Sequence, residues 1–129
     1  MQINLASVLV HDQEEALRFY TEVLGFVKKN DIPMGEIRWL TVSSPEGVKG
    51  VELALKLASR FPPAQTYQKA LFDTGIPATA FLTADLAADV LRLKGLGVRF
   101  RGEPKDMGHM TAVHFEDTCG NLLFLIQPH

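Results

Sequence analysis

The feature that most constrains this chain is an internal repeat in which residue n resembles residue n + 72. Two copies are too few for a solenoid, which needs at least about three repeats. We therefore expect two similar modules related by a pseudo-twofold axis, and the alternative is chance similarity between two amphipathic helices. The aligned pairs are Ala16 and Ala88, Phe19 and Leu91, Leu24 and Leu96, Gly25 and Gly97, and Phe26 and Val98.

The first module reads as a strand, a helix and three further strands. Asp12 followed by Glu15 is typical of a helix N-terminus, because both side chains can satisfy free backbone N–H groups. Gly25 stands where a left-handed residue would end that helix. The other expected elements are strands at 3–10, beginning at 26, at 37–43 and at 51–57, with a turn at 44–47 between the last two.

The second module repeats this order after a connection at 58–77. The pair Pro62-Pro63 predicts a break within a loop, and 64–72 shows weak helical character. Further along, Asp117 to Gly120 predicts the turn of a hairpin. The expected elements are a strand at 78–83, a helix at 86–96, a strand at 98–100, and hairpin strands at 111–116 and 121–127.

Composition gives few hints about partners. The 129 residues suit one domain, with module one at about 1–57 and module two at about 78–129. The net charge of −2 and the short basic run Arg99-Phe100-Arg101 do not indicate nucleic-acid binding. A single cysteine, no signal-peptide pattern and no long apolar run lead us to expect a cytoplasmic protein away from the membrane.

The two ends of the chain resemble the vicinal-oxygen-chelate superfamily, which includes glyoxalases, bleomycin-resistance proteins and extradiol dioxygenases. The opening carries an alternating strand, Asp12, a helix with Phe19-Tyr20, and Leu24-Gly25; the closing run 115–121 resembles the family's Asp-Pro-Asp-Gly-Asn hairpin. The resemblance implies an α+β fold in which two βαβββ modules form paired half-barrels around a cavity. It also implies a homodimer, since pairing would cover exposed strand edges.

The resemblance further implies a metal held by one residue from the first strand and one from the last strand of each module. The matching positions hold Leu5, Glu52, Ala78 (or Thr79 if the register slips) and Phe124. Only Glu52 can bind a metal, and one carboxylate would hold a divalent ion weakly. We therefore expect no metal and no other cofactor.

Glu52 is the leading candidate for a functional acid. Alternation along its strand places Leu53 and Leu55 against the helix and Glu52 towards the cavity. A carboxylate among apolar neighbours needs a partner or a shifted pKa. Glu52 would then serve as a general base or anchor a donor group of the ligand. Arg38 is expected to contact the ligand, and the alternative is that it pairs with Glu52 as a structural ion pair.

His114 is the second candidate, placed by the geometry of the turn. A three-residue loop with a left-handed Gly120 pairs His114 with Phe124, so both side chains should face the cavity. Histidine titrates near neutral pH and can move a proton. The alternatives are a purely structural histidine and a two-residue loop, which would reverse every side chain.

Aromatic and aliphatic side chains should form the walls. If Leu40 and Val42 face the helix, Trp39 faces the cavity, where it would contact a planar or apolar ligand or simply fill the core. Leu5 and Phe124 would complete the walls. The remaining candidates are weak: His11 reads as a surface residue, His109 as part of a loop, Cys119 as a turn residue without an activating base, and His129 as a frayed terminus.

Three functions fit these residues. The first is metal-independent binding of a small, partly apolar ligand, with Trp39, Leu5 and Phe124 as walls and Glu52 and His114 as anchors. The second is a glyoxalase-like lyase or isomerase acting next to a carbonyl, with Glu52 and His114 as acid and base. The third is an altered metalloenzyme that recruits Glu52, His114 and either solvent or a second chain. Sequence alone leaves open whether the protein is an enzyme.

Overall fold

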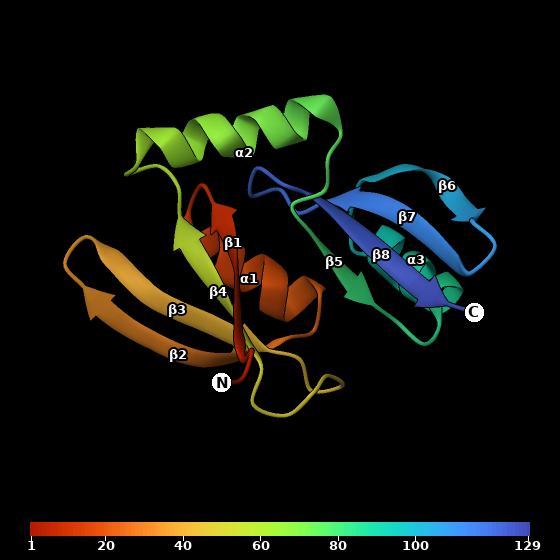
Figure 1. The fold of residues 1–129 in the computed structure, drawn as a ribbon, viewed down its shortest axis with the longest axis horizontal. Coiled ribbons are helices and arrows are strands. Elements are labelled where there is room, and N and C mark those ends of the chain that lie inside the picture. The colour runs from red at the N-terminus through yellow and green to blue at the C-terminus, as the bar shows by residue number, and fades with distance from the viewer. The chain divides into compact units, whose positions relative to one another are not determined.

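The computed structural model describes all residues from 1 to 129 and divides them into two compact units, 1–66 and 67–129 (Figure 1). Each unit contains a four-stranded mixed sheet with a helix against one face. The order strand, helix, three strands occurs once in each unit, so the prediction of an α+β fold made of two βαβββ modules is confirmed.

The first unit has the strand order β1-β4-β3-β2, in which β1 runs parallel to β4 and the other neighbours are antiparallel. A parallel neighbour requires a crossover, and the helix supplies it. The elements are β1 (Leu5–Val10), α1 (Gln13–Arg18), a π-helical turn η1 (Phe19–Val23), β2 (Val27–Met34), β3 (Ile37–Ser43) and β4 (Glu52–Leu57).

The helix begins as the sequence predicts and ends in an unexpected way. The carboxylate of Asp12 accepts a hydrogen bond of 2.9 Å from the backbone N–H of Glu15. After Arg18 the bonds widen to five-residue spacing, and the N–H of Leu24 donates to the carbonyl of Phe19. Gly25, with a φ of 88°, then ends the helix in the left-handed region that glycine tolerates.

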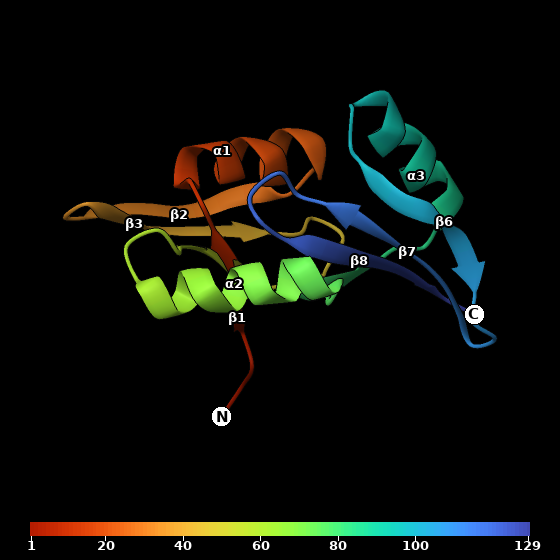
Figure 2. The ribbon, with the colours of Figure 1, turned by 90° about the horizontal axis from the view of Figure 1, so that it is seen from above.

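The core of the first unit lies between α1 and the sheet. Alternation along the strands sends every second side chain to this side, where five of them are buried. Figure 2 shows α1 on one side of the sheet only, so the opposite side of β1 to β4 faces away from the helix; we call it the open face. The buried helix-side residues are Val8, Val10, Leu40, Val42 and Leu55.

One irregularity interrupts the β2–β3 ladder. Lys28 pairs with Val42, but the next pair is Asn30 with Thr41, so Lys29 is an extra residue in β2. A bulge of this kind changes which side chains of the bulged strand face each side of the sheet. As a result, Asn30 lies on the same side as Thr41, and Asp31 lies on the helix side with Leu40.

The second unit repeats the arrangement with the order β5-β8-β7-β6. Asp85 caps α3 as Asp12 caps α1, accepting a 3.0 Å bond from the N–H of Ala88. The core again lies under the helix and includes Val113, Phe115 and Leu123. The elements are β5 (Thr79–Leu82), α3 (Leu86–Gly95), β6 (Phe100–Asp106), β7 (Met110–Glu116) and β8 (Leu122–Pro128).

The connection between the modules differs from the prediction. Helix α2 (Pro62–Thr74) starts at the two prolines that we expected to break a loop. Proline is tolerated in the first turn of a helix, because the N–H groups there have no partner within the helix. With thirteen residues, α2 is the longest helix, and no helix is long and apolar enough to cross a membrane.

The predicted strand at 98–100 is also displaced, since β6 runs from Phe100 to Asp106. Gly102 and Pro104 hid this strand from the sequence analysis, because both residues are unfavourable in regular strands. The structure accommodates them at a break in the ladder between Arg101 and Lys105. An edge strand can accept such a break, because one of its sides carries no ladder bonds.

Candidate functional site

The open face of the first sheet carries most of the residues that the sequence analysis selected. Strand pairing places them there: Leu5 lies beside Glu52, Trp39 beside Ile32, and Thr41 beside both Ala54 and Asn30. This pairing agrees with the predicted alternation. Glu52 and Trp39 lie on one side of the sheet, and the opposite side carries Leu40, Val42, Leu53 and Leu55. The paired open-face residues are Leu5, Ser7, Leu9, Val27, Asn30, Ile32, Met34, Ile37, Trp39, Thr41, Ser43, Glu52, Ala54 and Lys56.

Glu52 is held by two neutral hydrogen-bond donors. Its Oε1 accepts from the hydroxyl of Thr41 at 2.6 Å and from the amide Nδ2 of Asn30 at 2.8 Å. The same amide lies 3.1 Å from the Thr41 hydroxyl oxygen. Oε2 has no hydrogen-bond partner and is not among the buried polar atoms that would need one. Glu52 is therefore fixed in orientation with one oxygen left to accept a donor.

Arg38 does not belong to this group. It lies on the helix side, where its guanidinium donates to both carboxylate oxygens of Asp31, at 3.0 and 2.7 Å, and to Glu14 at 2.7 Å. The Arg38 guanidinium lowers the pKa of the Asp31 carboxyl, and these carboxylates raise the pKa of Arg38. The Glu52–Arg38 ion pair that we considered is not formed, because one-residue alternation along β3 puts Arg38 on the wrong side.

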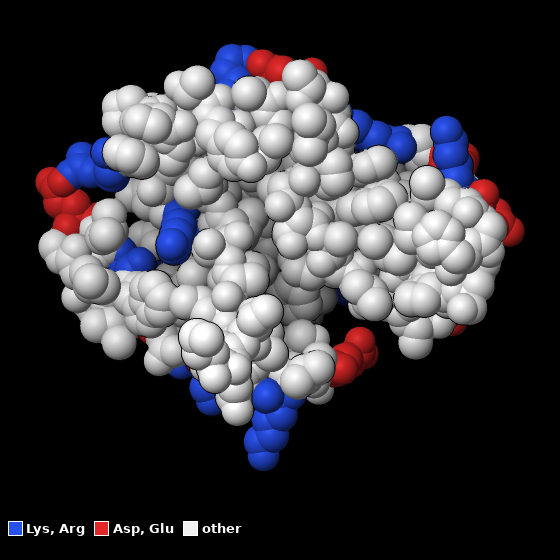
Figure 3. All heavy atoms as spheres, in the orientation of Figure 1, with Lys and Arg blue, Asp and Glu red and all other residues white.

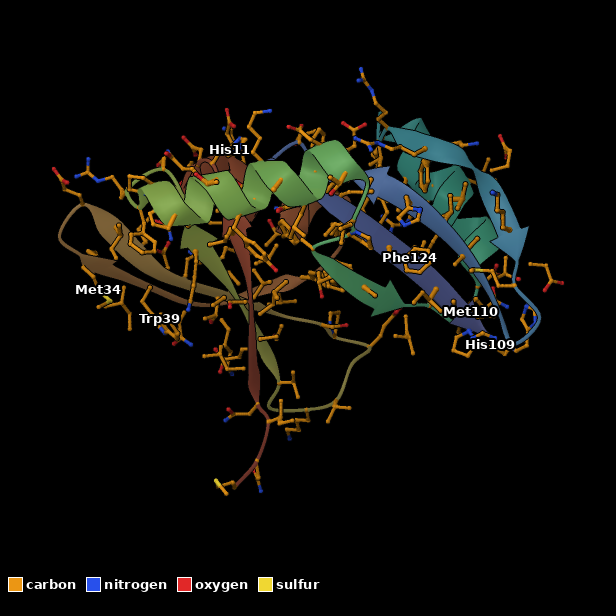
Figure 4. The ribbon with its side chains drawn as sticks, turned by 45° about the horizontal axis from the view of Figure 1, so that its top comes forward. His11, Met34, Trp39, His109, Met110 and Phe124 are labelled. Carbon is orange, nitrogen blue, oxygen red and sulfur yellow. The ribbon has the colours of Figure 1, made fainter.

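Apolar side chains surround the Glu52 group. Leu5 is 43% exposed and Ile32, beside Trp39, is 52% exposed, while Trp39 is partly covered. Figure 4 shows Trp39 near Met34 at the β2–β3 hairpin. The view of this face in Figure 3 is mostly uncharged, with basic groups inside the area of the first unit and acidic groups at its edges. Exposed apolar surface of this kind is typical of a binding region.

The second sheet brings His114 and Phe124 together as the turn geometry predicts. Asp117 pairs with Asn121 through a 3.2 Å backbone bond, which leaves a three-residue loop and sets His114 opposite Phe124. The two rings are stacked with centroids 4.4 Å apart. Partial burial, and then the positive charge of Arg101, lower the pKa of His114. The imidazole is therefore biased towards its neutral form, which can accept a proton.

Two residues beside this pair escaped the sequence analysis. Arg101 lies opposite His114 on β6, 3.4 Å from a carboxylate oxygen of Glu116, and its guanidinium lies 4.8 Å from the ring centroid of Phe72. Phe72 comes from α2, in a segment for which the sequence indicates only weak helical character. The only signal in the sequence was the short basic run at 99–101, and its partners depend on a register that the chain does not reveal locally.

The positions expected for metal ligands do not fit a metal. Leu5 and Glu52 lie side by side, but Glu52 is already bound to Thr41 and Asn30. In the second sheet, Ala78 donates its N–H to Leu122, and Phe124 lies two residues beyond. Neither side chain there can donate an electron pair. The structure contains no group of three or more His, Cys, Asp or Glu residues that could hold an ion.

The other histidines lie apart from these groups. Figure 4 places His11 near α1, away from Trp39, and His109 just before the first residue of β7, away from Phe124. The expectation that His129 frays is wrong: one ring nitrogen lies 2.7 Å from the Thr111 hydroxyl and the other 2.8 Å from the Gly108 carbonyl. Cys119 is buried in the β7–β8 turn, as a structural residue would be.

Two mixed sheets in βαβββ order, each with one open face, define the class of proteins to which this fold belongs. A model of the glyoxalase/bleomycin resistance protein/dioxygenase superfamily matches residues 2–125, and the chain belongs to this family. This agrees with the resemblance of the opening and closing segments. The family contains several activities on one fold, so membership alone does not define the reaction.

Relatives in sequence cover nearly the full chain. The uncharacterized protein YurT of Bacillus subtilis (strain 168) is 49% identical over 98% of this chain and 99% of its own length. Among solved structures, UcmS2 superposes with a TM-score of 0.84 at 29% identity, covering 98% of this chain and 97% of its own. TnmS3, an antibiotic binding protein from Streptomyces sp. CB03234, has a TM-score of 0.76 at 32% identity, covering 100% and 97%.

Proposed function

We propose that this protein binds a small, partly apolar ligand without a metal and that Glu52 is its principal polar anchor. The observation that carries the proposal is the arrangement of Glu52. Thr41 and Asn30 both bind Oε1, and Oε2 is left as an oriented acceptor on a largely apolar face. Such a carboxylate recognises a hydroxyl or amine of a ligand, and hydrogen bonds to a charged group are about twice as strong as neutral ones.

The surroundings of Glu52 favour an apolar ligand body. Leu5 and Ile32 expose large fractions of their side chains, and Trp39, which lies beside Ile32, adds an aromatic surface to the same face. Covering apolar area contributes roughly 25 cal/mol per Å² to binding. A ligand that presents one donor group and a flat apolar body therefore matches the chemistry of the open face.

The second sheet supplies a further pair of residues for the same role. His114 and Phe124 stack on each other, and Arg101 places a positive charge beside them. On this sheet we propose His114 as a polar anchor and Phe124 as an apolar wall. The likeness to TnmS3, which is described as an antibiotic binding protein, supports binding rather than catalysis as the function.

A direct test uses Trp39, which is the only tryptophan in the chain and so gives a single indole N–H signal in an NMR spectrum. The probes are 2-naphthylmethanol and 2-naphthylmethylamine, with 2-(methoxymethyl)naphthalene as the control that lacks a donor. We expect the two donors to shift the Trp39 signal at lower concentration than the control. Glu52→Gln should remove this preference while leaving the affinity for the methoxy compound unchanged.

The proposal is contradicted if the three naphthalenes behave alike on the wild-type protein. It is also contradicted if Glu52→Gln leaves the preference intact. Ser7→Ala is the matched control, because Ser7 lies on the same face without contacting Glu52. A ligand that binds only the folded state should in addition raise the melting temperature, in proportion to the logarithm of its concentration.

The alternative of a lyase or isomerase acting next to a carbonyl rests on His114, whose lowered pKa leaves it neutral and able to accept a proton near pH 7. Its test is turnover of methylglyoxal–thiol adducts, followed by ultraviolet absorbance, with wild type and His114→Phe. Turnover that is lost in His114→Phe would favour this alternative over simple binding.

We also propose that the protein forms a homodimer. Strand β2 is an edge of its sheet and exposes Val27 and Met34, which are 53% and 56% accessible. Covering apolar residues on an edge strand is a common role of a second subunit. Light scattering during size-exclusion chromatography would give the mass directly, and a mass of one chain at micromolar concentration would rule this out.

A further inference from the structure

Lys56 is a second charged residue on the open face of the first sheet. It lies beside Leu9 in the β1–β4 ladder, four residues after Glu52, and its side chain is exposed. The ladder is continuous from Leu5 to Val10, so alternation puts Lys56 and Glu52 on the same side. Among the paired open-face residues, Glu52 and Lys56 are the only two that carry charge.

Neither of these two charges is neutralised by a neighbour. Other ionic groups of this unit do form ion pairs, including Lys28 with Asp31, Arg38 with Glu14 and Asp31, and Arg60 with Glu36. Lys56 makes no ion pair and no side-chain hydrogen bond, and Glu52 binds only neutral donors. The open face therefore carries one carboxylate and one ammonium group that have no ionic partner.

The distance along the strand sets the length of a ligand that would contact both. Four residues of a strand span about 13 Å between Cα atoms, since each residue rises by about 3.3 Å. The lysine side chain can lean along the strand and shorten this span by several ångströms. Ala54 lies between the two charges, is small and is only 1% exposed, and Thr41 beside it is fully buried. The sheet surface between Glu52 and Lys56 is therefore uncharged.

We propose that the ligand of this protein is bipolar, with a cationic or hydroxyl donor for Glu52, an apolar body, and an anionic group for Lys56 at the other end. This inference rests on the proposed function and adds the class of ligand to it. An anion near Lys56 gains attraction, whereas an ester of the same shape gains none. For one exposed pair this difference amounts to about threefold to fivefold in affinity at low salt.

The test uses 4'-(aminomethyl)biphenyl-4-carboxylate, in which about 11 Å separate the amine from the carboxylate. Its methyl ester lacks the anion, and its N-acetyl derivative lacks the cation. Titration followed by the Trp39 indole signal gives the affinity for each. We expect the zwitterion to bind wild type about threefold to fivefold more tightly than the ester, and 0.5 M NaCl to reduce this ratio because salt screens exposed charges.

Two substitutions separate the ends of the ligand. Lys56→Met should abolish the preference for the acid over the ester, whereas Lys49→Met, in the exposed loop before β4, should keep it. Glu52→Gln should weaken the acid and the ester alike and should affect the N-acetyl derivative less, because that compound keeps only a neutral N–H donor. The two lysine variants alter exposed side chains and Glu52→Gln alters a half-buried one, and circular dichroism would confirm that each is folded.

The outcomes distinguish this inference from the function on which it rests. If the acid and the ester bind wild type equally, or if Lys56→Met keeps the preference, the role of Lys56 is overturned while the role of Glu52 stands. If Glu52→Gln binds the ester as tightly as wild type does, the proposed function itself is overturned. Failure of all three compounds to bind wild type at millimolar concentration would overturn both.

Discussion

The imidazole of His114 stacks on the phenyl ring of Phe124, with their planes inclined by only 13° and the Arg101 strand alongside. This arrangement buries part of the imidazole next to a positive charge. Both effects disfavour the protonated form, so the folded protein holds its proton less tightly than the unfolded chain does.

The first prediction follows from the sign of this shift. Between the lowered pKa of folded His114 and its usual value of 6.5, the unfolded chain binds more protons than the folded protein. Stability contributed by His114 is therefore complete above pH 6.5 and decreases as the pH falls through that window. Urea unfolding at pH 5 and pH 7.5 should show a smaller loss on acidification for His114→Phe than for wild type.

The comparison between wild type and His114→Phe is needed because the chain contains three other histidines. His11→Phe, at an exposed position, serves as the control and should behave like wild type. An NMR titration of the His114 ring gives the pKa directly. A value at or above 6.5 would contradict the prediction.

The second prediction concerns the Arg38 cluster. Arg38→Met should destabilise the protein by about 1 kcal/mol, because it removes a bidentate pair with Asp31 at a partly exposed position. Lys28→Met, which removes a longer contact of 3.8 Å to the same carboxylate, should change little. Urea titration at pH 7 measures both.

The same cluster should make stability sensitive to acid. Asp31 has a lowered pKa in the folded protein, so its contribution is present above pH 3.8 and is lost as the pH falls below that value. Arg38→Met should therefore lose less stability than wild type does when the pH falls below 3.8. Equal sensitivity in the variant and in wild type between pH 4 and pH 2.5 would argue against it.

The third prediction concerns Gln13, a buried amide on α1. Its Nε2 donates to the carbonyls of Arg38 and Leu55, each at 2.8 Å, and its Oε1 accepts from the N–H of Arg38 at 3.0 Å. Gln13→Leu leaves these backbone groups without partners and should cost about 1 to 3 kcal/mol. Gln65→Leu, at an exposed position of α2, is the matched control and should cost far less. Thermal unfolding would rank the two.

The fourth prediction is a gain in stability. Thr118 in the β7–β8 turn has a φ of 61°, and it is the only residue other than glycine with a positive φ. A β-branched residue is strained there, whereas asparagine tolerates this conformation. Thr118→Asn should raise stability by roughly 0.5 to 1 kcal/mol, and Thr118→Val should not. A lower melting temperature for Thr118→Asn than for wild type would refute this account.

The sequence predicts much of the fold because the relevant signals are local. Asp12 caps its helix through a residue three positions away, and the Asp117 turn sets the His114–Phe124 register through three loop residues. Because successive side chains of a strand point to opposite sides of the sheet, the sequence also predicts the side on which Trp39 lies. Each of these inferences needs only the spacing of neighbouring residues.

The unpredicted features depend on distant partners. The bond from Asn30 to Glu52 exists only because the extra residue Lys29 turns β2 within the ladder, and the contact of Phe72 with Arg101 joins a helix to an edge strand. Arg38 was considered as a partner of Glu52, although the antiparallel β3–β4 register sets Glu52 at the far end of β3 from Arg38. Its own strand alternation was overlooked, and that alternation decides its partners.

Lys29, the extra residue in β2, changes the electrostatics of the whole open face. In an uninterrupted ladder, Lys29 would stand opposite Thr41, and its ammonium group could reach the Glu52 carboxylate. With the bulge, an uncharged amide occupies that place instead. The inserted Lys29 thus prevents an ion pair between β2 and Glu52. The negative charge of Glu52 stays available to a cationic group of a ligand.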